Sequence, residues 1–193
     1  MKIYNFSAGP ACLPEPVLAA AAEASKQYMR TGMSLMEMSH RSTPVVELFE
    51  ETTERIKSLL AIPSNYHVLW LQGGASTQFS MVPLNLLPEG SSADYIETGA
   101  WSIKAIAECN KVGRANVIGS SKDVTFTFLP KDCEQNGDAS YLHITSNNTI
   151  YGTQYKVFPK VENPDGFLVA DMSSDILSKP IDVSKFGLIY AGA

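Results

Sequence analysis

The feature that most restricts the fold is an alternation of short apolar runs with segments of helical spacing. Runs of this length favour buried strands, because helices in globular proteins are usually longer. The expected strands span residues 68–71, 94–97, 115–118, 141–145, 167–170 and 188–190, with helices at 76–87 and 102–111 between the first three. Strands that alternate with helices predict an α/β domain in which helices flank a mostly parallel sheet.

Two more helices are expected before these strands. The first runs from Pro14 to Arg30, and Gly32 provides a natural stop. The second begins at Thr43, which can cap it, with Pro44 in its first turn. The apolar residues that follow recur at helical spacing, so this helix should present one apolar face.

The length of 193 residues suits one large domain. Residues 1–14 are rich in turn-forming types, and we predict an N-terminal arm there. Residues 15–193 are predicted to form the large domain. The sequence stops at Ala193, directly after an expected strand, where sites in parallel sheets lie. We therefore expect the chain to belong to a longer protein.

Charge and hydropathy disfavour two classes of partner. The net charge is −5, with acidic and basic residues interspersed, so no basic stripe is available for nucleic acid. No apolar run approaches the roughly 20 residues that a membrane helix needs. Residues 1–10 do not have the pattern of a signal peptide. We expect a cytoplasmic protein without a membrane partner.

The chain has three cysteines, Cys12, Cys109 and Cys133, which lie far apart in the sequence. An odd number at these separations matches neither a disulfide framework nor a metal-binding spacing. We expect reduced thiols, as in a cytoplasm, and no metal site.

The segment Gly73-Gly74-Ala75-Ser76-Thr77 joins an expected strand to an expected helix. Small residues let the backbone approach an anion, and the free N–H groups of a helix start favour phosphate. Ser76 and Thr77 add hydroxyl groups. A tight turn that needs glycine only for its backbone geometry explains the same residues.

Asp171 follows the apolar run 167–170, at the carboxyl end of an expected buried strand. A carboxylate there can keep a ring nitrogen protonated, which makes a pyridine ring a better electron sink. Alternatively, Asp171 only caps a turn, together with Ser173 and Ser174.

Trp101 and Thr149 also follow expected strands. The indole of Trp101 can stack on a flat cofactor ring, although an ordinary core tryptophan is the simpler interpretation. The hydroxyl of Thr149 can bond a cofactor oxygen, whereas loop threonines usually bond their own backbone.

His40-Arg41 precedes the second expected helix. Arg41 can form a bidentate pair with a carboxylate or phosphate, although most arginines at helix starts are solvated. We assign no role to His67 and His143.

Taken together, these residues place a phosphate cradle, an indole, a hydroxyl and an aspartate at one edge of the sheet. This set meets the needs of pyridoxal 5'-phosphate (PLP), which must have its phosphate anchored, its ring sandwiched, its phenolic oxygen bonded and its pyridine nitrogen paired.

The sequence resembles the phosphoserine aminotransferase family, within the fold-type-I class of PLP enzymes. The segments that carry the resemblance occur in the family's order, and they are Asn5–Ala11, Met36–Arg41, Gly73–Phe79, Asn147–Ile150, Ala170–Ser174, Pro180–Ser184 and Ile189–Ala193. In the family the last motif continues into Gln-Lys, whose lysine binds PLP covalently. The resemblance therefore implies that this lysine lies two positions beyond Ala193 and that the chain alone is inactive.

The resemblance also implies roles for individual residues. Ala75 and Ser76 would contact the cofactor phosphate, Trp101 would stack on the ring, Thr149 would bond the phenolic oxygen and Asp171 would pair with the pyridine nitrogen. Arg41, with His40, would bind the acidic substrate.

The implied reaction is reversible amino transfer between glutamate and 3-phosphohydroxypyruvate, giving O-phosphoserine and 2-oxoglutarate. The family serves serine biosynthesis and can serve pyridoxine biosynthesis. The resemblance further implies a homodimer with active sites at the subunit interface.

Alternatives remain from the residues themselves. The strand–Gly-Gly–helix turn also fits a non-enzymatic phosphate-binding α/β module, although it lacks the Walker and Rossmann spacings. A second alternative is an interaction fragment that pairs with a full-length partner. Another class V PLP aminotransferase or a cysteine desulfurase is a third.

Overall fold

The computed structural model describes residues 3–192, so Ala193, the end of the last motif, lies outside the described residues. The chain forms two compact units, Met1–Ile62 and Pro63–Ala193. The part of the predicted arm that is described, residues 3–14, contains no helix or strand. Within the described residues no helix is both long and apolar enough to cross a membrane.

The first unit consists of α1 (Glu15–Lys26), the short 3-10 helix η1 (Leu35–Glu37) and α2 (Thr43–Leu59). Pro44 lies in the first turn of α2, as the sequence predicts. Helix α1 ends at Lys26 rather than at Arg30, because the chain turns sharply there and Met29 has a φ of 52°. Apolar side chains of both helices are exposed, among them Val17, Leu18, Val46 and Phe49.

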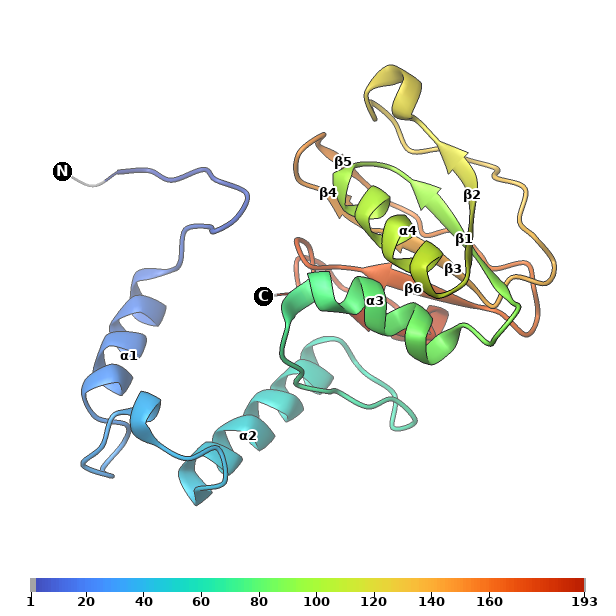
Figure 1. Ribbon diagram of the computed structural model, residues 1–193. Coiled ribbons are helices and arrows are strands. Elements are labelled where there is room, and N and C mark those ends of the chain that lie inside the picture. Colours follow the sequence, from blue (N-terminus) through green and yellow to red (C-terminus); the bar gives the residue numbers. More distant parts are fainter. Residues whose placement is uncertain (1–2, 193) are drawn as a thin grey trace. The chain divides into compact units, whose positions relative to one another are not determined.

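The second unit is built on a five-stranded sheet in which every pairing is parallel (Figure 1). In spatial order the strands are β2 (Arg114–Ser120), β1 (Ser92–Glu97), β3 (Tyr141–Thr145), β6 (Phe167–Asp171) and β7 (Leu188–Tyr190). A two-stranded antiparallel sheet, β4 (Asn147–Asn148) with β5 (Thr153–Gln154), follows β3. The predicted α/β architecture with a parallel sheet is confirmed.

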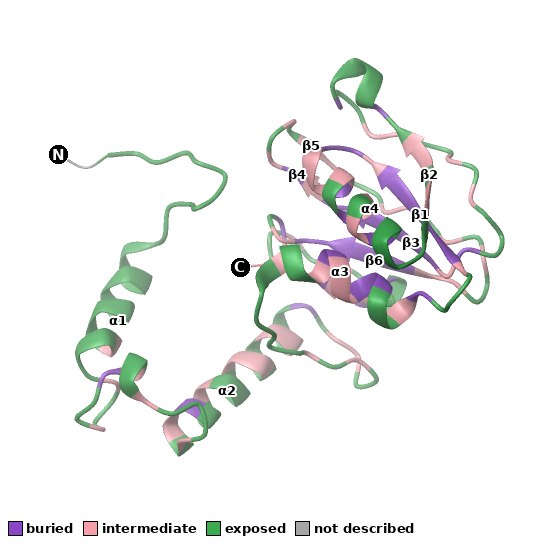
Figure 2. Ribbon diagram, in the orientation of Figure 1, coloured by how far each residue is buried: buried purple, intermediate pink, exposed green. Residues whose placement is uncertain are grey.

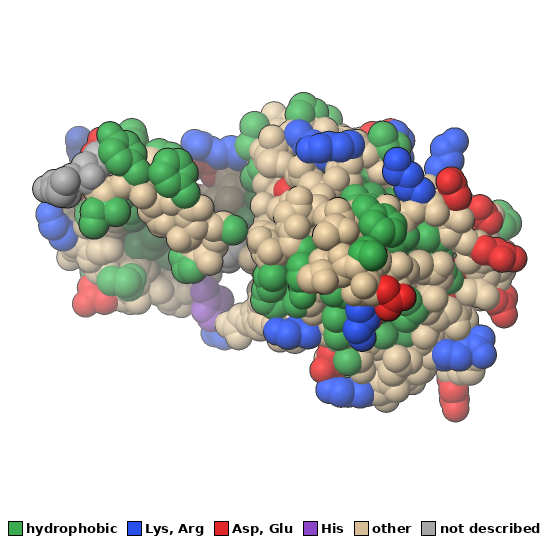
Figure 3. Space-filling view, turned by 90° about the horizontal axis from the view of Figure 1, so that it is seen from above, with side chains coloured by type: hydrophobic (Ala, Val, Ile, Leu, Met, Phe, Trp, Pro, Cys, Tyr) green, Lys and Arg blue, Asp and Glu red, His purple; other side chains and the backbone are tan. Residues whose placement is uncertain are grey.

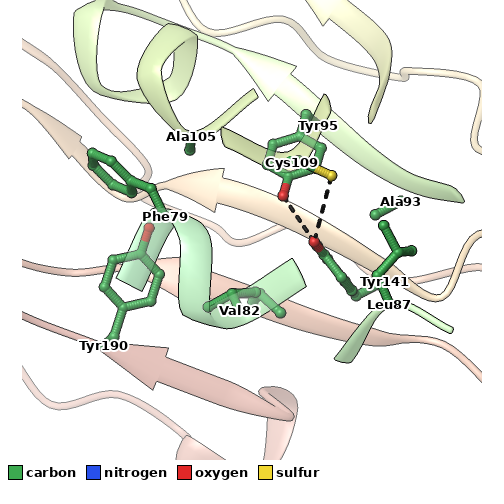
Figure 4. Close-up of a cluster of buried hydrophobic side chains, with 10 residues drawn as sticks. Phe79, Val82, Leu87, Ala93, Tyr95, Ala105, Cys109, Tyr141 and Tyr190 are labelled. Carbon is green, nitrogen blue, oxygen red and sulfur yellow. Dashed lines mark hydrogen bonds between the residues drawn. The ribbon is translucent and has the colours of Figure 1, made fainter. Parts of the chain in front are cut away.

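Helices α3 (Gly74–Leu86) and α4 (Ala100–Val112) pack on the first face of this sheet (Figures 1 and 2). The core between them is aromatic as well as aliphatic, and Figure 4 shows its side chains. Its buried members are Phe79, Val82, Leu87, Ala93, Tyr95, Ala105, Cys109, Tyr141, Val169 and Tyr190. This core supports the carboxyl ends of β3, β6 and β7, because each of these strands contributes a buried residue to it.

The second face of the sheet is covered by loops and the 3-10 helix η3 (Val183–Lys185) rather than by long helices. Its buried members are Ile96, Leu142, Ile144, Tyr155, Leu168, Ala170, Met172 and Phe186. Acidic and basic side chains are interspersed over the molecular face in Figure 3, without a basic stripe.

The strand predicted at residues 68–71 is wrong, because the segment forms neither helix nor strand. Leu69, Trp70 and Leu71 are 71%, 47% and 55% exposed. A strand exists only where a neighbouring strand completes its hydrogen bonds, and an apolar run alone does not supply one. Sequence patterns left residues 120–139 unassigned; Ser120 ends β2, and residues 121–139 contain the 3-10 helix η2 (Lys122–Val124) and loop.

The contact between Gly187 and Phe167 gives a test of this packing. A Cβ at Gly187 would lie 2.6 Å from Cγ and 2.7 Å from Cβ of Phe167, too close to the ring's root for a side-chain rotation to relieve. We predict that Gly187→Ala lowers the free energy of unfolding by about 1–3 kcal/mol. Gly137→Ala is the matched control, because a Cβ there meets nothing within 4 Å. Equal urea midpoints for the two variants would contradict the prediction.

Candidate functional site

The turn before α3 has the backbone that an anion cradle needs. Gly73 and Gly74 have φ angles of 94° and 61°, in the left-handed region that glycine adopts without strain. The Thr77 hydroxyl donates to the Gly73 carbonyl at 2.8 Å and closes the turn. Ala75 is half-buried and Ser76 is exposed. The first amides of α3 lack intrahelical acceptors, so they can bind an anion.

Asp171 ends β6 and is 5% exposed. Its Oδ1 accepts hydrogen bonds from the backbone N–H of Ser173 at 3.0 Å and from the Ser173 hydroxyl at 2.6 Å. Burial raises the pKa of this carboxyl, although the two Ser173 bonds act in the opposite direction. Asp171 therefore does cap the turn at Ser173, as the simpler interpretation predicts. Its carboxylate is nevertheless buried at the end of the strand.

Gly192, two residues after β7, connects this carboxylate to the start of α3. The backbone N–H of Gly192 donates to the Ser173 hydroxyl at 3.0 Å. A Cβ at Gly192 would lie 2.7 Å from the backbone nitrogen of Ala75. Gly192 therefore contacts both the turn Asp171–Ser173 and the first residues of α3.

The loop that carries Thr149 is fixed to the start of α4. The Asn148 amide donates to the Thr98 hydroxyl at 3.2 Å, and a Cβ at Gly99 would lie 2.7 Å from Asn148 Oδ1. Thr149 is half-buried in this loop. Trp101 lies in the first turn of α4, half-buried, with Lys104 Nζ 4.5 Å from its ring centroid.

The same loop is tied to β6. Both the backbone N–H and the hydroxyl of Ser146 donate to the carbonyl of Asp171, each at 2.9 Å. The hydroxyl also contacts Asp175. The segments that carry four predicted groups, those of Ala75, Trp101, Thr149 and Asp171, thus meet at the carboxyl edge of one sheet.

His40 and Arg41 lie in the first unit, and both are exposed. The backbone N–H of Arg41 donates to the Ser39 hydroxyl at 3.2 Å, which fixes the turn before α2. Their role in binding an acidic substrate stays a prediction.

Thr145 is a site candidate that sequence reasoning missed. It pairs with Asp171 in the register of β3 and β6, so the two side chains lie on the same face of the sheet. Its hydroxyl is buried and has no hydrogen-bond partner among the described residues. Buried hydroxyls usually have a partner, so Thr145 is a candidate to bind a group from outside the chain.

A buried polar network lies beneath this edge and was also missed. His143 Nε2 and the Tyr190 hydroxyl share a hydrogen bond of 2.9 Å, and the imidazole stacks on Tyr95 at 4.8 Å. The Tyr95 and Tyr141 hydroxyls share a bond of 2.8 Å, and Cys109 Sγ contacts the latter at 3.8 Å (Figure 4). Burial lowers the pKa of His143 to about 3, so its imidazole is neutral at pH 7.

No group of three or more His, Cys, Asp or Glu side chains that could hold a metal occurs within residues 3–192. The segments at this edge of the sheet offer a buried carboxylate, hydroxyls, a partly buried indole and free helix amides. These groups suit an organic ligand with an anionic group and a flat ring.

Comparison with known proteins places the chain in a family. The family model described as Aminotransferase class-V matches residues 3–193. The chain belongs to this family. The resemblance to phosphoserine aminotransferases that the motifs indicate is confirmed by the similarities that follow.

A curated phosphoserine aminotransferase from Desulfatibacillum aliphaticivorans is 55% identical, over 100% of this chain and 53% of the relative. The solved phosphoserine aminotransferase from Bacillus circulans subsp. alkalophilus is 47% identical with a TM-score of 0.93, over 100% of this chain and 53% of that one. A PLP-bound phosphoserine aminotransferase from Trichomonas vaginalis is 37% identical with a TM-score of 0.90, over 98% and 53%. This class-V aminotransferase chain spans about half the length of these relatives.

The neutral state of His143 in this class-V aminotransferase chain predicts a pH dependence. The unfolded imidazole binds a proton below its ordinary pKa of about 6.5, whereas the folded one stays neutral down to about pH 3. Stability is therefore lost as the pH falls from about 6.5 towards 3, by at most about 1.4 kcal/mol per pH unit. We predict a shallower slope for His143→Gln in urea unfolding at pH 7, 6 and 5.

His67→Gln is the control for loss of a histidine, since His67 is exposed. The slopes are compared rather than the absolute stabilities, because His143→Gln also changes packing. If the free energy of unfolding depended on pH equally in His143→Gln and in the unmodified chain, the imidazole would not take up a proton when the chain unfolds.

Proposed function

We propose that this chain is the cofactor-binding part of a PLP-dependent phosphoserine aminotransferase. The enzyme would transfer an amino group reversibly between glutamate and 3-phosphohydroxypyruvate, giving O-phosphoserine and 2-oxoglutarate. The main support is a buried carboxylate, Asp171, that is joined through Ser173 and Gly192 to the start of α3. Membership of the class-V aminotransferases supports the same reaction type.

The residues present fit PLP. The Gly73–Gly74 turn and the free amides at Ala75 and Ser76 suit its phosphate. A buried carboxylate at Asp171 suits a pyridinium nitrogen, because no cation among residues 3–192 offsets the cost of burying this acid. The remaining contacts would come from Trp101 on the ring and Thr149 on the phenolic oxygen. Thr145, whose buried hydroxyl lacks a partner among the described residues, can add one more hydrogen bond.

PLP, when bound, supplies an electron sink that stabilises negative charge on the substrate carbon. Asp171 would keep the ring nitrogen protonated; Ser173 fixes Oδ1, so Oδ2 is the oxygen that would be available for that nitrogen. Trp101 would exclude water from one side of the ring, and the free amides at the start of α3 would stabilise the charge of the phosphate. These roles concern binding and electrostatics, which the enzyme that contains this chain would use during amino transfer.

Substrate binding is proposed for the first unit. Arg41 would pair with the carboxylate or phosphate of the substrates, with His40 beside it. A homodimer is part of the proposal, and the exposed apolar residues of α1 and α2, such as Val17 and Phe49, support an association through this unit. A cytoplasmic location and roles in serine and pyridoxine biosynthesis complete it.

Replacement of Asp171 tests the proposal. In the enzyme that contains this chain, Asp171→Ala should lower kcat/KM by roughly two to four orders of magnitude, because an uncharged pyridine delocalises the carbanion poorly. Glutamate-dependent conversion of 3-phosphohydroxypyruvate measures activity, and circular dichroism checks the fold. Asp165→Ala is the control, since Asp165 is exposed and remote from β6's carboxyl end. Near-normal turnover in folded Asp171→Ala would remove this residue from the site.

Gly192 provides a test of cofactor binding that does not depend on activity. A Cβ at Gly192 would lie 2.7 Å from Ala75 N and 3.0 Å from Ala75 Cβ, so it would displace the helix start. We predict that Gly192→Ala weakens PLP binding by about tenfold or more, measured by absorbance titration. Gly137→Ala should bind as the unmodified protein does. Unchanged PLP affinity in Gly192→Ala would separate the helix start from the cofactor.

A further inference from the structure

The second face of the sheet contains a cavity that the proposed function does not use. Its volume is about 740 Å³, within the roughly 300–1,000 Å³ of small-molecule sites. It lies between strands β1, β2 and β3 and two loop segments, residues 129–135 and 154–162. Asp171 lies on the opposite face, because side chains alternate and Val169 belongs to the first core. The cavity is therefore separate from the proposed PLP site.

The floor of this cavity is apolar. Ile96, Ile118 and Leu142 come from three neighbouring strands, and Phe158 and Val161 come from the loop opposite. A ligand that excludes water from these side chains gains from the hydrophobic effect. The floor therefore favours a flat or aliphatic body rather than a sugar or a free ion.

The two loops that wall the cavity are joined by Gln135. Its amide nitrogen donates to the carbonyl of Lys160 at 2.7 Å, and its amide oxygen accepts from the backbone N–H of Glu162 at 3.0 Å. One side chain thus bridges residues that are far apart in the sequence. The walls hold their spacing through these bonds, so the cavity is preformed.

Tyr155 lines the cavity and carries a hydroxyl without a partner. The residue is 5% exposed, and its hydroxyl is buried with no hydrogen-bond partner among residues 3–192. Its backbone is fixed, since its N–H donates to Ser146 and its carbonyl accepts from Lys179, both at 2.9 Å. Its ring stacks on Phe158 at 6.5 Å. The Tyr155 side chain therefore forms a fixed part of the cavity wall.

The rim of the cavity is positive although the chain is negative. Three exposed lysines, Lys131, Lys156 and Lys160, face two exposed acids, Asp132 and Glu162. The rim therefore carries a charge of about +1 at pH 7, whereas the whole chain carries −5. A local reversal of charge sign at the mouth of an apolar cavity favours an anionic ligand.

We propose that this cavity binds a small organic anion with an apolar body. The body lies on the Ile96–Ile118–Leu142 floor, and its carboxylate, sulfonate or phosphate group faces Lys131 and Lys160. This is a second binding site, on the face of the sheet opposite the proposed PLP site.

The probe is 1-anilinonaphthalene-8-sulfonate, an apolar anion whose fluorescence rises in apolar sites. We expect saturable binding of one probe per chain. A second readout is alkylation of Cys133, a half-buried thiol that lines the cavity, with N-ethylmaleimide. It is followed by peptide mapping in a Cys12→Ser background, because Cys12 is exposed. Bound probe should slow modification of Cys133 several-fold.

Charge reversal at the rim supplies the matched test. Lys131→Glu with Lys160→Glu should weaken probe binding about tenfold or more and leave stability unchanged, since both lysines are exposed. The control reverses Lys122, an exposed lysine of η2 that does not line the cavity, together with Lys185 of η3. It makes the same change in net charge and should keep the unmodified affinity.

Tyr155→Phe keeps the ring and removes the hydroxyl. Because this hydroxyl is buried without a partner among the described residues, we expect a free energy of unfolding at least as high as that of the unmodified chain and an unchanged probe affinity. Equal loss of affinity in the rim variant and its control would overturn the proposal, because it would indicate non-specific binding. So would a lack of Cys133 protection, or a Cys133 already shielded without probe. Asp171→Ala should leave probe binding intact, so the proposal for this cavity and the proposal for the PLP site are tested independently.

Discussion

The parallel register of β3, β6 and β7 is the constraint on which the rest of the second unit depends. It sets Thr145 beside Asp171 and Asp171 beside Tyr190, at the edge where the strands end. A slip of one residue would turn Asp171 to the opposite face, away from α3 and α4. The hydrophobic effect fixes this register, because Val169 must face the first core and Leu168 and Ala170 the second.

The polar groups inside the first core also help to fix the arrangement of the strands. Tyr95, Tyr141 and Cys109 satisfy one another, and His143 bonds Tyr190 while it stacks on Tyr95. Directional hydrogen bonds of this kind allow fewer arrangements than aliphatic packing does, so they add specificity to the strand order. The floor beneath the candidate site is thus both apolar and hydrogen-bonded.

The sequence predicted those features that depend on local pattern. The strands at Tyr141–Thr145 and Phe167–Asp171, the turn at Gly73 and the place of Asp171 at a strand end follow from apolar runs and their punctuation. The prediction of a strand at residues 68–71 failed because a strand needs a neighbouring strand, which no local sequence pattern reveals. The Thr145 hydroxyl and the His143–Tyr190 bond were missed because they arise from register, which relates residues distant in sequence.

The close approach of Gly192 to Ala75 has a consequence for the order of folding. The two residues stand near opposite ends of the second unit's sequence, so their meeting is a contact of high sequence separation. Forming such a contact costs the conformational entropy of closing the long loop between the two residues. The helix start and the Asp171 turn can therefore come together only once β7 has joined the sheet. During synthesis, residues 73–76 are made long before Gly192, so the pocket proposed for PLP can be complete only after β7 has been made.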